Sequence, residues 1–211
     1  MADTQNFTYT QLLSLLPSYM ERSDAAFNAQ ISTFVALAEN RIATDMKQQG
    51  FQSVVTGMLP LIPSMQKPAF WRETISFSYK NAAGKIKPLE LRTLEYLKNY
   101  WPDQAQAAEP KYYADYNIAN FLLGPTPSAT FTFELVYYAR LQPLSVDNQT
   151  NWTTLNAPQA LLYAILLEAS LWAKSADKIA NWQGQYDTAK AGLLLENTER
   201  LADRNTAVTR A

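Results

Sequence analysis

Two runs in which apolar and polar residues strictly alternate limit the folds open to this 211-residue chain. One face of the first run, 70–79, carries Trp71, Ile75, Phe77 and Tyr79. One face of the second run, 130–138, carries Phe131, Phe133, Leu135 and Tyr137. Alternation with period two is typical of a strand that has one buried face. The two runs therefore predict antiparallel strands, joined to their neighbours by short connections.

Helical patterns lie on both sides of this β-rich stretch. Apolar residues recur at steps of three and four from Ser23 or Asp24 to about Gln49, which predicts one long amphipathic helix. A second long helix is predicted from Asp177 to about Arg204 on the same kind of pattern. Between the strands, Pro88 is well suited to begin a helix that ends before Pro102.

The segment 157–174 is apolar around most of its circumference. Its apolar members are Leu161, Leu162, Tyr163, Ile165, Leu166, Leu167, Leu171 and Trp172. A helix that exposes one side to solvent has polar residues along that side, unlike this segment. The helix is therefore expected either at the centre of a bundle or against a neighbouring subunit.

These patterns predict an α+β protein made of two parts. Residues 1–66 and 142–211 are expected to form a helical bundle of long helices. Residues 67–141 are expected to form an inserted subdomain with a small antiparallel β-sheet and one embedded helix. Within that subdomain, 111–123 is expected to form two strands around Asn117, or one bent strand.

The composition excludes several kinds of chemistry. The chain has no His and no Cys, so imidazole catalysis, thiolate metal sites and disulfides are excluded. The six glycines are scattered, so no phosphate-binding loop exists. We therefore expect no catalytic residue, no cofactor and no metal. No segment resembles a secretion signal or a bilayer-spanning helix, so we expect a soluble protein made in a cytoplasm.

Two other functions remain open from the residues alone. Trp71, Trp101, Tyr112 and Tyr113 are candidates for an aromatic sugar platform, as in a carbohydrate-binding or glycoside-hydrolase-like domain. Such a site needs paired carboxylates, for which the candidates are Glu73, Asp115 and Glu134. The simpler interpretation is that these carboxylates face solvent on strands.

The β-rich stretch is also locally basic. Cations that contribute to this character include Lys67, Arg72, Lys80, Lys85, Lys87 and Lys111. Cations interleaved with aromatics occur in proteins that bind single-stranded nucleic acid. Lysines also protect exposed strand edges from pairing with other chains, which explains the same pattern without a ligand.

Several runs of the chain resemble the head-to-tail adaptor (neck) proteins of tailed bacteriophages. They are 34–42, 88–96, 133–140 with 143–145, and 157–164, together with Asn151-Trp152-Thr153 and the closing 196–200. The resemblance extends from about Leu12 to Arg204.

The resemblance implies a structural virion protein without enzymatic activity. Proteins of this family form a ring of identical subunits, usually twelve, below the portal protein of the capsid. Their β-rich part faces a tail tube or nozzle protein. DNA passes through the central channel without sequence-specific binding, and no membrane is involved. The protein is then located in the neck of the virion, after synthesis in the cytoplasm of a bacterial host.

Two groups of residues become candidate contacts under this interpretation. The portal or subunit interface is expected to include Leu166, Leu171, Trp172, Arg200, Arg204 and Arg210. The tail-facing surface of the β subdomain is expected to include Arg72, Lys80, Lys85, Lys87 and Lys111.

Overall fold

The structure is a computed structural model that describes residues 7–46 and 51–201, with the backbone alone for residues 200 and 201. The chain divides into two compact units. The helical unit comprises Met1–Phe51 and Leu141–Ala211, and the β-rich unit comprises Gln52–Arg140.

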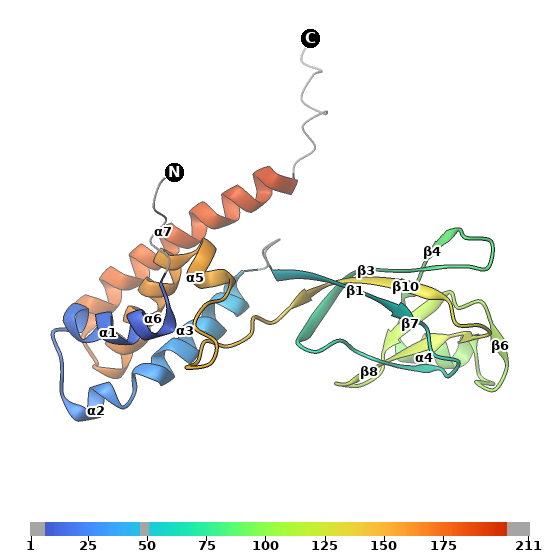
Figure 1. The fold of residues 1–211 in the computed structure, drawn as a ribbon, viewed down its shortest axis with the longest axis horizontal. Coiled ribbons are helices and arrows are strands. Elements are labelled where there is room, and N and C mark those ends of the chain that lie inside the picture. The colour runs from blue at the N-terminus through green and yellow to red at the C-terminus, as the bar shows by residue number, and fades with distance from the viewer. Residues whose placement is uncertain (1–6, 47–50, 202–211) are drawn as a thin grey trace, which may run out of the picture. The chain divides into compact units, whose positions relative to one another are not determined.

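The helical unit contains six of the helices that the structure describes (Figure 1). They are α1 (Tyr9–Met20), α2 (Ala25–Asn28), α3 (Ile31–Asp45), α5 (Trp152–Asn156), α6 (Pro158–Trp172) and α7 (Ala176–Leu201). Short polar side chains begin several of them. The Thr8 hydroxyl accepts a hydrogen bond from the Gln11 amide, and Asp24 accepts one from the Phe27 amide. These bonds satisfy N–H groups that the first turn of a helix leaves unpaired.

Helix α6 lies at the centre of the helical unit. It packs against α1, α3, α5 and α7, and Leu161, Ile165 and Leu166 are fully buried. Neighbours on several sides explain why this helix is apolar around most of its circumference. Most of the helix, from Ala160 to Ser170, therefore occupies the central one of the two expected positions.

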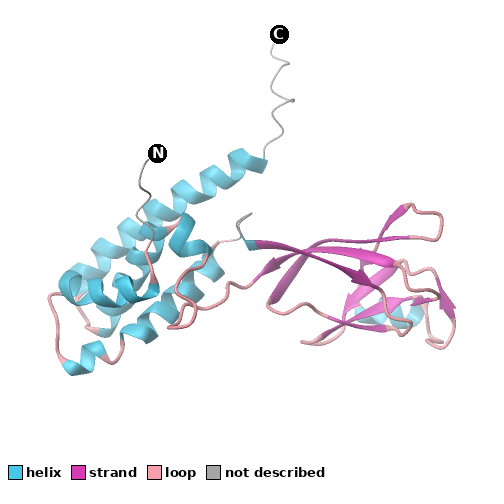
Figure 2. Ribbon diagram, viewed as in Figure 1, coloured by secondary structure: helices cyan, strands magenta, loops and turns pink. Residues whose placement is uncertain are grey.

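The β-rich unit contains ten strands and one helix among its residues (Figure 2). The strands are β1 (Gln52–Met58), β2 (Ser64–Gln66), β3 (Trp71–Lys80), β4 (Ile86–Pro88), β5 (Glu90–Leu91), β6 (Ala107–Ala108), β7 (Tyr112–Asp115), β8 (Asn120–Gly124), β9 (Thr126–Pro127) and β10 (Thr132–Ala139). Sheet A has the order β1-β10-β3-β4, and sheet B has the order β2-β8-β7-β5. The short strands β6 and β9 form a separate parallel pair.

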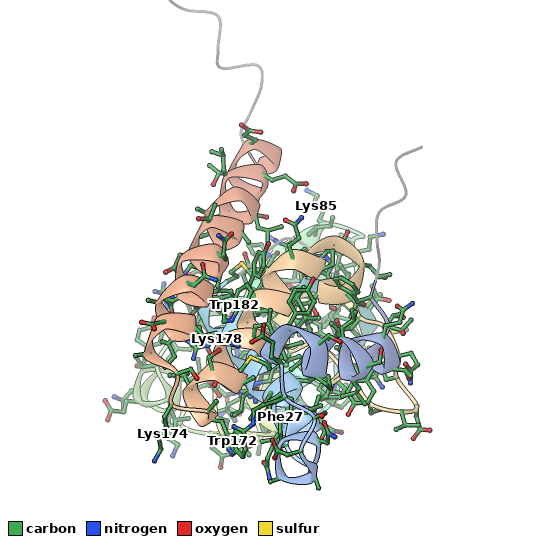
Figure 3. All side chains as sticks on the ribbon, turned by 90° about the vertical axis from the view of Figure 1, so that its left-hand side faces the viewer. Phe27, Lys85, Trp172, Lys174, Lys178 and Trp182 are labelled. Carbon is green, nitrogen blue, oxygen red and sulfur yellow. The ribbon has the colours of Figure 1, made fainter. Side chains whose placement is uncertain are left out.

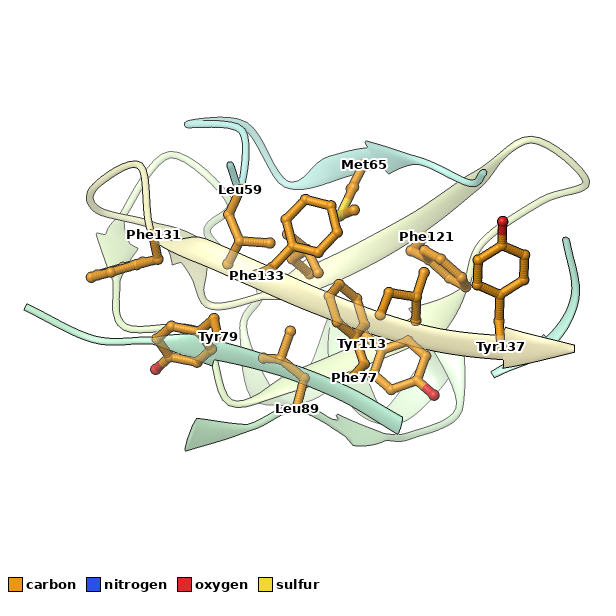
Figure 4. Packing of buried hydrophobic residues seen from close by; sticks show 12 residues of the cluster. Leu59, Met65, Phe77, Tyr79, Leu89, Tyr113, Phe121, Phe131, Phe133 and Tyr137 are labelled. Carbon is orange, nitrogen blue, oxygen red and sulfur yellow. The ribbon is translucent and has the colours of Figure 1, made fainter. Parts of the chain in front are cut away.

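The core of this unit lies between sheets A and B (Figure 4). Phe77 of β3 lies with its ring centroid 5.3 Å from that of Tyr113 in β7 and 5.7 Å from that of Phe133 in β10. Residues of both sheets therefore form one apolar cluster. On the other side of sheet B, helix α4 (Leu94–Tyr100) covers Ala114 and Leu122 with Leu97.

The predicted architecture, a helical bundle of long helices with one small antiparallel β-sheet, is wrong. The structure is mixed α+β, with 44% helix and 24% strand. Seven helices occur among the described residues, and only five have seven residues or more. The β-rich unit has several sheets, and the pairs β5–β7 and β6–β9 are parallel.

The helix predicted from about residue 24 to 49 is interrupted within its first two turns. Ala29 and Gln30 separate α2 from α3, and α3 ends at Asp45 within the described residues. Phe27 and Ile31 are both buried, one on each side of the break. The apolar stripe continues across this break, so the periodicity of the sequence does not reveal that the helix is interrupted.

Strand β3 also departs from its predicted alternation. Its pairing with β10 shifts register between Val136 and Tyr137 and again between Tyr138 and Ala139. Such bulges insert an extra residue and reverse the faces beyond it. Phe77 and Tyr79 therefore point into the core as predicted, whereas Ile75 is 43% exposed. The prediction that 111–123 forms two strands around Asn117 is confirmed, because Asn117 lies in the turn between β7 and β8.

Candidate interaction surfaces

Among the described side chains of the predicted interface, those at the end of α6 reach the surface. Leu171 is 44% exposed and Trp172 is 39% exposed, whereas Leu166 is fully buried. In this conformation the Leu166 side chain has no surface to offer a partner. The buried side of Trp172 packs on Phe27, at 6.0 Å between ring centroids (Figure 3). Arg22 lies over the Trp172 ring at 5.0 Å.

The three predicted arginines at the C-terminus are described only in part. Arg200 lies in α7, and its side chain is outside the described set. Arg204 and Arg210 lie outside the described residues altogether. Their role at an interface therefore stays a prediction.

Four of the five predicted tail-facing cations lie toward one end of the β-rich unit. Lys80, Lys85 and Lys87 belong to the β3–β4 hairpin, and all three are exposed. Lys87 and Lys111 line the same shallow hollow, together with Glu90 and Glu109. Arg72 lies near the other end of β3, next to a register shift, and does not join this group.

Lys67, another basic residue of this stretch, has a different environment. Its side chain is only 4% exposed, and its Nζ atom lies 2.6 Å from Asp115 Oδ1 and 2.7 Å from the Asn117 carbonyl oxygen. The Trp71 ring lies 4.1 Å from the same ammonium group. Lys67 therefore fastens the β7–β8 turn to the core and is not available to nucleic acid.

The structure does not bring the four candidate aromatic residues into one platform. Trp71 and Tyr113 pack in the core between sheets A and B. Trp101 and Tyr112 lie on the α4 side of sheet B, each near the Tyr100 ring. The sugar-platform alternative thus loses two of its four rings.

The three candidate carboxylates also lie apart in the fold. Glu134 pairs with Thr56 and Ser78 in sheet A, and Asp115 belongs to sheet B, where it binds Lys67. Glu73 lies opposite Tyr138 in sheet A. In the described part of the chain, no group of three or more acidic residues is placed to hold a metal ion.

A mostly apolar groove in the helical unit was not predicted from the sequence. It has a volume of about 750 Å³ and runs between the start of α6 and the second half of α7. Its lining is Phe7, Asn156, Ala157, Pro158, Gln159, Ala160, Thr188, Ala189, Gly192, Leu193 and Glu196. Glu196 is the single charged residue of that lining. Several of the lining residues, such as Ala189 and Gly192, are small, and small residues give no sequence pattern that would indicate a groove.

A buried carboxylate fixes the segment that precedes α5. Glu39 of α3 accepts hydrogen bonds from the Leu144 amide at 3.1 and 3.2 Å and from the Asn151 side chain at 2.6 Å. Burial raises the pKa of the Glu39 carboxyl, and these two donors oppose that rise. Burial and the neighbouring Asp45 likewise raise the pKa of the Tyr186 hydroxyl, which donates to Asp45 at 3.0 Å.

A family model described as SU10 adaptor protein matches residues 7–211 of the chain. The chain belongs to the SU10 adaptor protein family. This is a family of phage head-to-tail adaptors, so the resemblance read from the sequence is confirmed. No curated protein matches the chain.

Membership of the SU10 adaptor family fixes the general role of the protein. An adaptor of this kind is a virion component that interacts with portal and tail proteins. Within residues 7–46 and 51–201, no helix has both the length and the apolar character needed to cross a bilayer.

Proposed function

We propose that twelve copies of the chain form a ring between the portal and the tail tube or nozzle, with a central channel for DNA. The family match across residues 7–211 is the observation that carries this proposal. The formal net charge of −1 suits a channel through which DNA slides, because it gives no overall attraction to a polyanion. The role is structural and includes no catalytic step.

The portal or subunit contact is proposed to involve the exposed end of α6. Leu171 and Trp172 supply apolar surface there, and Trp172 is held on one side by Phe27 and Arg22. A large side chain that is already held in place loses little conformational freedom when a partner covers it. Tryptophan is also enriched among the residues that dominate binding energy at interfaces. The cations Arg200, Arg204 and Arg210 are proposed to add charged contacts.

The β-rich subdomain is proposed to meet the tail. Lys80, Lys85, Lys87 and Lys111 present several positive charges on one end of the β-rich unit, and Arg72 adds another elsewhere on β3. Such charges suit an acidic partner surface and set the rate and orientation of docking. In this proposal, the helical unit forms the portal-facing body, and the β-rich unit, which contains residues 67–141, forms the tail-facing part.

The mass of the assembly tests the proposal directly. Native mass spectrometry of the full chain, alone and mixed with the portal protein of the same phage, is expected to show a complex that contains twelve copies. The double variant Leu171→Ser with Trp172→Ser is expected to weaken that complex. Leu61→Ser, which changes another exposed leucine in the β-rich unit, is the matched control. A single copy in both samples would rule out the ring.

A further inference from the structure

Strand β1 is the longest edge strand of the sheets that the structure describes. It has seven residues, whereas the other edges of sheets A and B are β4 and β2 with three residues each and β5 with two. An edge strand presents unpaired N–H and C=O groups, which makes it a template for a strand from another chain. Length alone therefore singles out β1 as a candidate for strand addition.

The two edges of sheet A differ in their protection. At the β4 edge, Lys85 and Lys87 supply charge, and Pro88 has no N–H group to donate. These are the features by which proteins keep strand edges from pairing. Strand β1 contains no charged residue and no proline, and its Val54 and Met58 are 61% and 62% exposed. The β1 edge therefore has the features of a surface that pairs with another strand.

The register of β1 shows which backbone groups face the open edge. The Leu59 amide donates to the Phe131 carbonyl at 2.8 Å, just beyond the Met58–Thr132 pair. In an antiparallel ladder, hydrogen-bonded and non-hydrogen-bonded pairs alternate. The N–H and C=O groups of Val54 and Thr56 thus point away from β10, toward the open edge.

The core between the sheets is also incompletely covered at this edge. Val55 packs against the apolar core but is only partly buried, whereas its cross-strand neighbour Leu135 is fully buried. A further strand beside β1 would cover Val55. Burial of this apolar surface would add to the energy of the new backbone hydrogen bonds.

We propose that the C-terminal segment 202–211 of a neighbouring copy adds to β1 as a further strand of sheet A. This inference rests on the ring of the proposed function. The segment follows α7 directly and has ten residues, which span about 33 Å when extended. The seven residues of β1 need about 23 Å. The segment contains no Pro or Gly, and Thr206, Val208 and Thr209 favour strands.

Charge also fits this occupant. Glu134 is exposed on the outer face of sheet A, directly opposite Thr56 of β1. The segment 202–211 carries Arg204 and Arg210, and β1 has no cation that would repel them. A contact between two different surfaces of the same chain is heterologous, and repetition of such a contact closes a ring when the rotation fits. The added strand thus supplies one specific link between adjacent subunits.

The absence of Cys from the chain permits a clean cross-linking test. Full-length Val54→Cys and Val208→Cys proteins are mixed, with and without portal protein, and treated with a short bismaleimide. We expect a covalent dimer in the mixture that neither variant forms alone, because each chain contains one thiol and a Val54–Val208 link must join two copies. Val146→Cys mixed with Val208→Cys is the control, since Val146 is 77% exposed and lies in the helical unit.

A second pair of variants tests the backbone pairing. Thr56→Pro removes one N–H at the open edge and leaves the bonds of Val55 and Gly57 to β10 in place. We expect it to weaken assembly by about tenfold, the order of effect of one lost hydrogen bond at an interface. Thr56→Val keeps the N–H and is expected to assemble normally. Where Thr56→Pro fails to fold, the cross-link alone decides.

The outcomes separate this inference from the proposed function. A ring without a Val54–Val208 cross-link above the control overturns the strand addition and leaves the ring intact. Cross-linking of Val208→Cys to the portal alone also overturns it, because the segment then docks elsewhere. A cross-link between free chains with no ring in any mixture supports the pairing of β1 and contradicts the ring.

Discussion

Lys67 is buried, whereas the carboxylate that pairs with it is open to solvent. Their side chains are 4% and 58% exposed, and 2.6 Å separates Lys67 Nζ from Asp115 Oδ1. The ammonium group also contacts the Asn117 carbonyl and the face of Trp71. The two partners therefore depend on each other unequally: Asp115 can be hydrated alone, but Lys67 cannot.

The first prediction follows from this inequality. Asp115→Ala leaves a buried ammonium without its counter-charge, so we expect a loss of about 3 kcal/mol in the free energy of unfolding. Lys67→Met removes the buried charge and keeps an apolar chain of similar length. We expect a smaller loss of about 1–2 kcal/mol, from the freed carbonyl and the lost contact with Trp71. Urea denaturation measures both, and equal losses would contradict the unequal dependence.

The second prediction concerns the pH dependence of stability. Burial raises the pKa of Glu39 above its ordinary value of 4.5. As pH rises from that value to the folded-state pKa, the unfolded chain has released the Glu39 proton and the folded chain still holds it. Stability therefore falls with rising pH across this window, by at most about 1.4 kcal/mol per pH unit for one proton. Above the folded-state pKa this contribution becomes constant.

The variant Glu39→Gln isolates that contribution. It has no titrating group at this position, so the difference in unfolding free energy between it and the natural chain is expected to vary with pH in the same window. Urea denaturation at a series of pH values provides the measurement. Glu95→Gln changes an exposed carboxylate of α4 and is the control. A difference for Glu39→Gln that does not vary with pH would contradict the assignment.

The sequence predicted what depends on local periodicity and missed what depends on contacts between distant segments. Alternation located β3 and β10, and turn residues located the β7–β8 turn at Asn117. The exposure of Ile75 arises from bulges in the pairing with β10, which no local pattern records. The family was recognised from the sequence itself.

For the candidate surfaces too, the sequence predicted the local features and missed those that depend on contacts with distant residues. Lys67 was grouped with the other lysines because its sequence neighbours do not include Asp115, which binds it from 48 residues away. The apolar character of α6 predicted burial but not depth, since Leu166 and Leu171 look alike in the pattern and differ completely in exposure. Such differences depend on which neighbours pack on each turn of a helix.

The third prediction uses that difference between two leucines of one helix. Leu166→Ala leaves a cavity in a fully buried site and is expected to lower the free energy of unfolding by about 2–5 kcal/mol. Leu171→Ser changes a side chain that is 44% exposed, so its cost should stay below about 1 kcal/mol. Under the proposed interface, Leu171→Ser should nevertheless weaken assembly with the portal, as measured by native mass spectrometry. Unchanged assembly would remove Leu171 from the interface.

The fourth prediction compares two glycines that differ in the space around them. A Cβ atom on Gly57 would lie 2.9 Å from Cε1 of Phe133, whose ring is buried and packs on Phe77. A shift of the ring would disturb its packing on Phe77, so Gly57→Ala is expected to destabilise the protein by about 1–3 kcal/mol.

Gly184 of α7 is the opposite case, because a Cβ atom there meets nothing within 4 Å. Gly184→Ala should stabilise the protein by about 0.5–1 kcal/mol, since glycine loses more backbone freedom than alanine when a helix forms. Thermal or urea denaturation of the two variants gives the signs. If Gly57→Ala were neutral, the Phe133 ring would have to shift, and the close approach of β1 to the core would not be a constraint on this edge of sheet A.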